Sequence, residues 1–422
     1  MKKRLVIIGA GPAGLCSAIG ATEAGLSCDD ILLLEREDEL GGVLNQCIHD
    51  GFGEYTLGES LTGTEYAERL ITEVKKRGIP YLTGSTVLSI TPDKEITLVS
   101  STLGYTRISA EAIILAMGCR ERSHGSLRIA GTRPAGVFSA GTVQRFINIE
   151  GQLPGKKVVL FGSGDIGLVT ARRLTIEGAK VLGVYERKPH PTGLDKNMKE
   201  CLEEFGIPFY TGKTISKILG KERVEGVLIS SVDENLKIIK GTEQLVKCDT
   251  LVLSLGLIPD NSIPQDTGIA LDRITGGAIV NQRYETQIEG IFACGNALHI
   301  HDYVDHIARE ATKTGINAGE CLLGKIPKAT HQIKISHNKN VKYTVPQKID
   351  FPLKSEEYVT LSYRSIKVVK NAKISVLADD EEIYTEALEV IRPSRQHKIR
   401  LTSDMLEKIS KASVLALNVT EE

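Results

Sequence analysis

One pattern occurs twice in this chain and constrains its fold more than any other feature. An apolar run long enough for a buried strand leads into a glycine-rich turn, and a helix-forming segment follows at once. The first copy joins Leu5–Ile8 to Gly9–Gly14, and the second joins Lys157–Phe161 to Gly162–Gly167. Two strand–turn–helix units of this kind predict two doubly wound domains, each built on a parallel sheet.

The glycine spacing in the first copy predicts a dinucleotide site. Gly9 permits the tight turn, Gly11 lets a pyrophosphate approach the backbone, and Gly14 allows close packing of helix on strand. The free N–H groups at the helix mouth favour the phosphate charge. Glu35 ends the next apolar strand about twenty residues later, where a carboxylate accepts the hydroxyls of an adenosine ribose.

The second copy repeats these elements. Gly162, Gly164 and Gly167 have the same spacing, and Glu186 ends the strand that follows. A glycine turn can also be a simple connection between a strand and a helix, but here the whole strand–helix–strand context is present. We therefore expect a second dinucleotide site.

The chain is long enough for three domains. Its 422 residues exceed one ordinary hydrophobic core, and from about residue 331 strand-like alternation replaces the glycine pattern. The expected fold class is α/β, with two Rossmann-like doubly wound domains and a small β-rich C-terminal domain. The expected boundaries are 1–125 with 280–328 for the first domain, 126–279 for the second and 331–422 for the third.

Composition excludes several classes of partner. With 52 basic and 53 acidic residues the chain has no charge excess that would suggest nucleic acid as a partner. No apolar run approaches the roughly eighteen residues of a membrane span. Met1–Arg4 followed by an apolar stretch resembles a secretory signal, but that stretch runs directly into the glycine turn. We expect a soluble, cytoplasmic protein.

The cysteines are dispersed, which suits a reducing cytosol. None of the eight belongs to a C-x-x-C pair, so their spacing predicts neither a zinc knuckle nor a thioredoxin-like redox couple nor an iron–sulfur cluster. They are Cys16, Cys28, Cys47, Cys119, Cys201, Cys248, Cys294 and Cys321.

The order of these parts resembles the flavoproteins with two dinucleotide-binding domains, the superfamily of glutathione reductase and thioredoxin reductase. Over about residues 4–325, the matching pieces include both fingerprints, Gly41-Gly42, Leu255–Asp260 and Ile291–Asn296. The resemblance implies FAD in the first fingerprint and NAD(P)H in the second. Disulfide-reducing members carry a C-x-x-C or C-x4-C pair beside the flavin, and this chain has neither.

A narrower resemblance concerns Gly118–Arg122, Gly131–Gly141 and Cys294–Asn296. These segments are similar to the FAD/NAD subunits of heteromeric amine and imino-acid dehydrogenases, such as sarcosine oxidase alpha, proline dehydrogenase and hydrogen cyanide synthase subunits. They also resemble flavoproteins associated with anaerobic glycerol 3-phosphate dehydrogenase. This implies a small-molecule substrate, together with a partner redox subunit or a homo-oligomer.

The resemblance also implies the residues that contact each cofactor. Asn296 stands where the family usually has Asp, so it would bond the flavin's ribityl chain without charge. The implied FAD contacts are Gly9, Gly11, Pro12, Ala13, Gly14, Glu35, Arg36, Gly42, Val43, Val87, Ala116, Gly118, Gly295, Asn296 and Asp302. The implied NAD contacts are Gly162, Ser163, Gly164, Asp165, Ile166, Gly167, Glu186, Arg187 and Gly256.

The choice between the two nicotinamide coenzymes rests on neighbouring charges. Glu186 would repel a 2′-phosphate, which favours NAD(H). Arg187 and Lys188 follow at once and keep NADP(H) open.

Candidate catalytic residues lie in two places. Cys47 and His49 follow Gly42, and a thiolate beside an imidazolium would be reactive, although a buried cysteine can also serve in packing alone. The second place is the segment His299–His306, which holds His299 and His301.

Three interpretations of this second segment compete. It tunes proton transfer at the flavin's pyrimidine edge, it is a solvent-facing polar loop, or it binds a metal through its H-x-H pair. Because no further ligand cluster is evident, we expect no metal. Asp302 or Asp305 would cap the helix that begins near Val304.

Three functions follow. The first is an FAD-dependent oxidoreductase that moves hydride or electrons between NAD(P)(H), FAD and a small donor or a partner redox subunit. The second is a flavin-dependent NADH oxidase, or a disulfide or peroxide reductase, that uses Cys47. The third is a non-catalytic nucleotide-binding scaffold in a redox complex.

Overall fold

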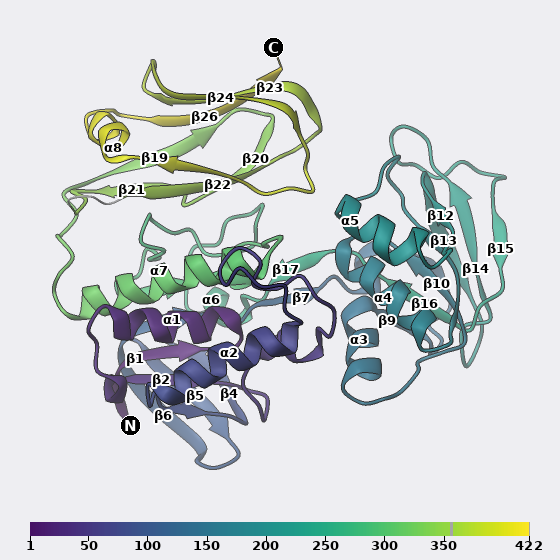
Figure 1. The fold of residues 1–422 in the computed structure, drawn as a ribbon, viewed down its shortest axis with the longest axis horizontal. Helices are drawn as coiled ribbons and strands as arrows, with labels where there is room; N and C mark the ends of the chain where they lie inside the picture. Colours follow the sequence, from purple (N-terminus) through teal and green to yellow (C-terminus); the bar gives the residue numbers. More distant parts are fainter. Residues whose placement is uncertain (355–357, 422) are drawn as a thin grey trace. The chain divides into compact units, whose positions relative to one another are not determined.

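The computed structural model describes residues 1–354 and 358–421 (Figure 1). It contains two compact units. The first combines Met1–Asn45, Asp50–Cys119 and the chain from Pro259 onward, and the second combines Gln46–His49 with Arg120–Ile258. Residues 259–279, which we expected in the second domain, therefore group with the first unit.

The first unit is built on a parallel sheet, as the apolar runs predict. Its strand order is β3-β2-β1-β6-β18, with every neighbouring pair parallel. An antiparallel meander of β4 and β5 continues from the first half of β6. The strands are β1 (Lys2–Ile8), β2 (Ile31–Leu34), β3 (Tyr81–Leu82), β4 (Ser85–Ile90), β5 (Glu95–Ser100), β6 (Gly104–Leu115) and β18 (Ile291–Ala293).

Helices from distant parts of the sequence pack together in this unit. α1 (Pro12–Glu23) packs against both α2 (Gly63–Lys76) and α7 (Val304–Leu322), whereas the short helix α6 (Ser262–Asp266) packs against β4. Figure 1 shows α1 along α7, and glycines bring their backbones into contact. A Cβ added to Gly20 would lie 2.2 Å from the carbonyl oxygen of Thr312, and one added to Gly315 would lie 2.0 Å from that of Ser17. This close packing fixes the start of α7 relative to the first fingerprint.

The second unit repeats the doubly wound plan. Its parallel sheet has the order β12-β11-β10-β16-β9, and β13, β14 and β15 form an antiparallel sheet joined by β8. The strands are β8 (Ala130–Gly131), β9 (Val137–Ser139), β10 (Lys157–Phe161), β11 (Lys180–Tyr185), β12 (Phe209–Tyr210), β13 (Lys213–Leu219), β14 (Gly226–Ser231), β15 (Gln244–Val246) and β16 (Thr250–Leu253). The helices are α3 (Ala140–Asn148), α4 (Asp165–Ile176) and α5 (Asp195–Met198).

The chain crosses between the units on two strands that pair with each other. These are β7 (Cys119–Glu121) and β17 (Leu257–Pro259). The outgoing and returning segments are therefore neighbours.

The C-terminal part of the first unit is β-rich, as predicted, and has its own apolar core. One sheet has the order β21-β19-β26-β23-β24 and the other β20-β22-β25. The elements are β19 (His331–His337), β20 (Val341–Val345), β21 (Lys348–Phe351), β22 (Val359–Ser365), β23 (Val369–Ala378), β24 (Glu381–Ile391), β25 (His397–Leu401), α8 (Ser403–Ser410) and β26 (Leu415–Glu421). None of the helices in the described part of the chain is long and apolar enough to cross a membrane.

Candidate functional site

The first cradle consists of the turn between β1 and α1 together with Glu35 at the end of β2. The Glu35 carboxylate is buried and accepts hydrogen bonds from the backbone N–H groups of Ala10 (2.8 Å) and Glu37 (3.0 Å). A carboxylate can accept about four hydrogen bonds, so Glu35 retains capacity for ribose hydroxyls.

The glycines of this turn leave space where a pyrophosphate would lie. A Cβ on Gly9 would lie 2.5 Å from the carbonyl oxygen of Ala116, and one on Gly14 would lie 1.8 Å from that of Gly9, so both positions need glycine. At Gly11 the nearest neighbour of an added Cβ is the Cα of Gly42, 3.9 Å away. No side chain caps α1, so its first N–H groups can receive an anion. This cradle fits the adenosine diphosphate part of FAD.

The turn after β18 approaches the same helix. A Cβ on Gly295 would lie 2.7 Å from that of Ala13, so this turn also needs glycine. The Asn296 side chain accepts a hydrogen bond from the His301 backbone N–H (3.0 Å), and its Nδ2 donates to Cys119 Sγ (3.7 Å).

The remaining residues implied for FAD lie in different environments. Their contacts with the cofactor stay predictions. Pro12 begins α1, and Gly42 faces Gly11. Val87 is buried in β4, Gly118 has positive φ, and the Ala116 N–H donates to the carbonyl oxygen of Ile8. Val43 is exposed, and Arg36 forms an ion pair with Glu37 at the surface.

Two acidic residues near α7 do not act as expected. Asp302 forms an ion pair with Arg364 and accepts a hydrogen bond from the Gln396 backbone N–H (2.6 Å), so its carboxylate is bonded to the C-terminal part, and its contact with FAD stays a prediction. Asp305 accepts hydrogen bonds from the backbone N–H groups of Gly53 (3.3 Å) and Thr56 (2.8 Å). Neither residue caps α7, and no side chain caps its N-terminus. The expectation that they compete for the N–H groups of α7 was therefore wrong.

The second cradle follows the same backbone plan. Gly162 has positive φ, and a Cβ there would lie 2.1 Å from the carbonyl oxygen of Ser254. The buried carboxylate of Glu186 accepts hydrogen bonds from the backbone N–H groups of Ser163 (3.0 Å) and Lys188 (2.9 Å). It also accepts hydrogen bonds from the side-chain hydroxyls of Ser163 (2.7 Å) and Thr192 (3.4 Å).

Other residues implied for NAD have partners within the second unit. Asp165 accepts hydrogen bonds from the Leu194 backbone N–H (2.8 Å) and Asn197 Nδ2 (2.7 Å). The Arg187 guanidinium donates to the Leu236 carbonyl oxygen (3.1 Å from Nε), and Gly256 accepts from the Arg122 backbone N–H (3.0 Å). Gly164 is the N-cap of α4, and a Cβ added there would have only ordinary contacts. Ile166 lies in the first turn of α4, and Gly167 packs on Ser254.

Cys47 and His49 lie in the short segment that groups with the second unit. Asn148 Nδ2 donates to the carbonyl oxygen of Gln46 (2.7 Å), which holds this segment on α3. Burial raises the pKa of the Cys47 thiol to about 12, so the thiol is protonated at neutral pH. The idea of a reactive thiolate at Cys47 finds no support in this environment.

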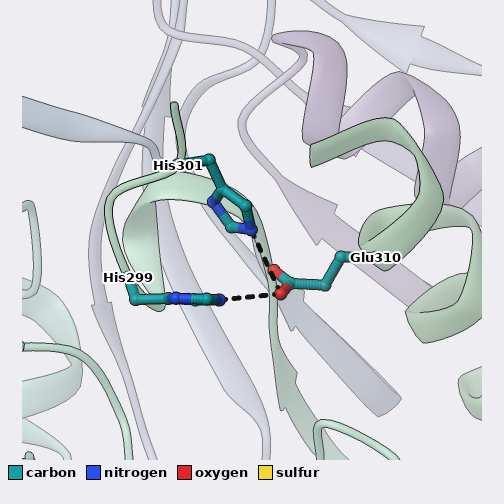
Figure 2. A group of neighbouring side chains, drawn as sticks. All are labelled: His299, His301 and Glu310. Atoms are coloured by element: carbon teal, nitrogen blue, oxygen red, sulfur yellow. Dashed lines mark hydrogen bonds and ion pairs between the residues drawn. The ribbon is translucent and has the colours of Figure 1, made fainter. Parts of the chain in front are cut away.

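His299 and His301 converge on a residue that the sequence analysis did not identify, Glu310 on α7 (Figure 2). His299 Nε2 lies 2.8 Å and His301 Nε2 lies 3.2 Å from Glu310 Oε2. The other carboxylate oxygen accepts the Gly295 backbone N–H (2.8 Å). His299 Nδ1 lies 2.9 Å from Gln396 Nε2.

This cluster is buried. Both imidazole side chains are 0% exposed, so neither presents surface to a cofactor, and any effect on a flavin would be transmitted through Asn296 or Gly295. Burial and the neighbouring His301 lower the pKa of His299 to about 4. Burial by itself would raise the pKa of Glu310, but the adjacent imidazoles of His301 and His299 outweigh it and hold that pKa below its usual range.

Comparisons with known proteins agree with the two-cradle fold. The family described as pyridine nucleotide-disulphide oxidoreductase matches residues 3–343. Thioredoxin reductase of Bacillus subtilis is 27% identical over 292 residues, which are 69% of this chain and 85% of that protein. The hydrogen cyanide synthase subunit HcnB of Pseudomonas protegens is 26% identical over 288 residues, 63% of this chain and 58% of that protein.

A solved structure shares the fold. The crystal structure of T. acidophilum thioredoxin reductase has a TM-score of 0.61 with 22% identity, and the match covers 76% of this chain and 98% of that one. The family binds FAD and NAD(P)H, which agrees with the expected pair of cofactors. This chain belongs to the pyridine nucleotide-disulphide oxidoreductase family and is a flavin- and NAD(P)H-linked oxidoreductase.

Proposed function

We propose that the chain passes hydride or electrons between NAD(H), FAD and a small-molecule donor or a partner redox subunit, with no dithiol relay of its own. One observation carries this proposal: two glycine–carboxylate cradles occur in a chain with no disulfide. All eight cysteines lie in the described ranges, and none of them is in a disulfide bond. A relay through protein sulfur needs a pair that can close and open.

The protein's own groups supply binding and electrostatics in this scheme. Bound FAD supplies the hydride chemistry at its flavin ring. Glu35 and the uncapped mouth of α1 would hold the adenosine diphosphate part. The N-terminus of α7 has no side-chain cap and would offer partial positive charge to the pyrimidine end of a reduced flavin bound beside it.

The donor or partner is proposed on the basis of similarity. HcnB is, by its name, a subunit of hydrogen cyanide synthase, and its likeness to this chain supports a partner redox subunit. The narrower motif resemblance supports an amine, an imino acid or glycerol 3-phosphate as the small molecule. Glu186 supports NAD(H) over NADP(H) because its buried carboxylate would repel a 2′-phosphate.

Reduction through Cys47 is the second candidate function. The raised pKa of its thiol argues against it, because the thiolate is the nucleophile and is nearly absent at neutral pH.

Anaerobic stopped-flow absorbance tests the proposal directly. The full chain, reconstituted with FAD, is mixed with NADH, with NADPH and with the candidate donors, and the flavin band is followed. We expect bleaching by NADH and by one donor class, and NADH bleaching should persist in Cys47→Ser. A chain that takes up no FAD would overturn the proposal. Bound flavin that no reductant bleaches would favour the scaffold function instead.

A further inference from the structure

The strongest unassigned cluster joins two histidines and a glutamate. His299 and His301 lie between η5 (Gly295–Ala297) and α7, and Glu310 lies on α7. In Figure 2 both rings point their Nε2 edges at one carboxylate. The three candidate ligand atoms lie within 4.8 Å of one another. We propose that His299, His301 and Glu310 bind a divalent transition-metal ion of the zinc type.

The spacing of the three atoms suits such an ion. Bonds from zinc to histidine nitrogen and carboxylate oxygen are about 2.0–2.2 Å long, which places neighbouring ligand atoms about 3–3.5 Å apart in a tetrahedron. The two N···O separations here are 2.8 and 3.2 Å. These two separations would lengthen by a few tenths of an ångström to admit the ion, and the third, between the two ring nitrogens, is no more than 4.8 Å.

Asn296 can support metal binding by His301. Asn296 Oδ1 accepts the His301 backbone N–H (3.0 Å), which identifies this atom as the amide oxygen. The same oxygen lies 3.4 Å from His301 Nδ1 and can accept a hydrogen bond from it. In the tautomer that carries its proton on Nδ1, the lone pair of Nε2 is directed toward Glu310 Oε2 and can bind the ion.

Gln396 can give His299 the same pattern. Its Oε1 is buried and has no hydrogen-bond partner among the described residues, while its Nε2 lies 2.9 Å from His299 Nδ1. Turning the amide over places Oε1 beside Nδ1, where it accepts a hydrogen bond from the ring N–H. His299 Nε2 is then free to bind metal, and Gln396 becomes the outer partner that metal-bound histidines usually have.

Charge and donor type point to the class of ion. Glu310 is buried, and its ion-pair partners among the described residues are the two histidines. A buried carboxylate needs positive charge nearby, and a divalent cation would add to the charge that Lys398 already directs at Glu310. Two imidazoles with one carboxylate favour zinc, iron, cobalt or nickel, whereas magnesium and calcium favour oxygen ligands alone. Three protein ligands leave a position for one further small ligand.

The ion would join the turn after β18, here called the cofactor turn, to α7 and to the C-terminal part. Gly295 and Asn296 bond directly to Glu310 and His301. Gln396 and Arg364 of the C-terminal part hold His299 and Asp302. Metal binding would therefore connect the turn, α7 and the C-terminal part, which gives the ion a structural role.

Metal titration of the full, FAD-loaded chain tests the proposal without any turnover assay. The purification tag is removed, the protein is stripped with a chelator, and Co²⁺ is added while its visible absorption is followed. Zn²⁺ is then added as a competitor, and Mg²⁺ serves as the negative control. We expect one equivalent of Co²⁺ with a low-coordinate spectrum, displaced by Zn²⁺ and unaffected by Mg²⁺.

Variants locate the bound ion. His299→Ala and His301→Ala should each weaken Co²⁺ binding at least about 100-fold, and Gln396→Ala about 10- to 100-fold. His337→Ala removes an exposed histidine of β19 and should change nothing. If a ligand variant fails to fold by circular dichroism, Glu310→Gln, which keeps the side chain's size, replaces it. A stripped wild type that binds no Co²⁺, or ligand variants with wild-type affinity, would overturn the proposal and leave the proposed function untouched.

Discussion

In the first cradle the Glu35 carboxylate accepts hydrogen bonds from the backbone N–H groups of Ala10 and Glu37. In the second cradle Glu186 makes the equivalent two bonds and also accepts the hydroxyls of Ser163 and Thr192. Those hydroxyls take lone pairs that a ribose would otherwise use. Similar fingerprints can therefore differ in affinity, since a ligand in the second cradle must displace groups already bound there.

The loop after β11 adds to this difference. Asp165, in the first turn of α4, accepts hydrogen bonds from Leu194 and Asn197. A Cβ on Gly193 would lie 2.8 Å from the carbonyl oxygen of Ser163, so the loop packs directly on the second fingerprint. We infer that the first cradle suits a resident cofactor and the second suits one that exchanges at each turnover.

The largest effect should come from the last glycine of each fingerprint. Gly14→Ala places a Cβ 1.8 Å from the backbone oxygen of Gly9, and a backbone atom cannot move away easily. Overpacking of about 1–3 kcal/mol should lower FAD affinity by about 5- to 150-fold. In Gly167→Ala the added Cβ would lie 2.7 Å from the Ser254 Cβ and 2.9 Å from the carbonyl oxygen of Gly162, so its clash is milder than the one at Gly14. NADH affinity should fall by about tenfold while flavin content stays at the wild-type level.

Flavin-to-protein absorbance after gel filtration and the NADH dependence of flavin reduction measure these two variants. Full flavin content in Gly14→Ala, with loss in Gly167→Ala, would reverse the assignment of the cradles.

Removing a hydroxyl from the second cradle and adding one to the first should make their ligand affinities more alike. Ser163→Ala frees one lone pair of Glu186, and since a hydrogen bond contributes about 1 kcal/mol, the Kd for NADH should fall by about fivefold. Ala10→Ser should raise the Kd for FAD by a similar factor. Isothermal titration of the apoprotein gives the FAD value, and Ala10→Cys is the size-matched control with a weak donor. If Ser163→Ala weakens NADH binding instead, the hydroxyl belongs to the coenzyme site.

A smaller effect is expected from Arg187. Its guanidinium already donates a hydrogen bond to the carbonyl oxygen of Leu236, so we expect it to contribute little to binding of a 2′-phosphate. Arg187→Ala should change the ratio of kcat/KM for NADPH to that for NADH by less than about threefold. A selective tenfold loss with NADPH would show that this side chain leaves Leu236 to reach the 2′-phosphate.

The smallest effect is predicted for Cys47. With a pKa of about 12 the thiol carries almost no thiolate at pH 8, so Cys47→Ser should change NADH-driven turnover by less than about twofold. Mass spectrometry after iodoacetamide treatment should show alkylation that stays slow near pH 9 and accelerates only as the pH approaches 12. Rapid labelling at pH 8 that also abolishes turnover would contradict this.

The sequence predicted the local parts of the fold well. The strand that Glu35 follows, the strand Lys157–Phe161 and the start of the helix at Val304 occur at the expected positions, because apolar runs and glycine turns act over a few residues. Glu35 and Glu186 could be identified because each ends a strand at a fixed distance from its fingerprint.

Long-range partners could not be predicted in this way. Glu310 meets His299 only because α7 turns back beside the cofactor turn, and no pattern between His301 and Glu310 signals that return. Gln396 comes from the β-rich C-terminal part. The expectation of no metal depended on the lack of a third ligand in the sequence, and folding brings a candidate for it, Glu310, beside the two histidines. The ion pair of Asp302 with Arg364 also joins positions far apart in the chain.

The pairing of β7 with β17 has a consequence for engineering. Residues 120–258 leave and rejoin the rest of the chain at adjacent points, so a short hairpin could replace the whole segment without stretching either stump. Other electron-delivering domains could then be inserted at the same two points. Replacing residues 120–258 in this way could change the coenzyme while the rest of the chain stays the same.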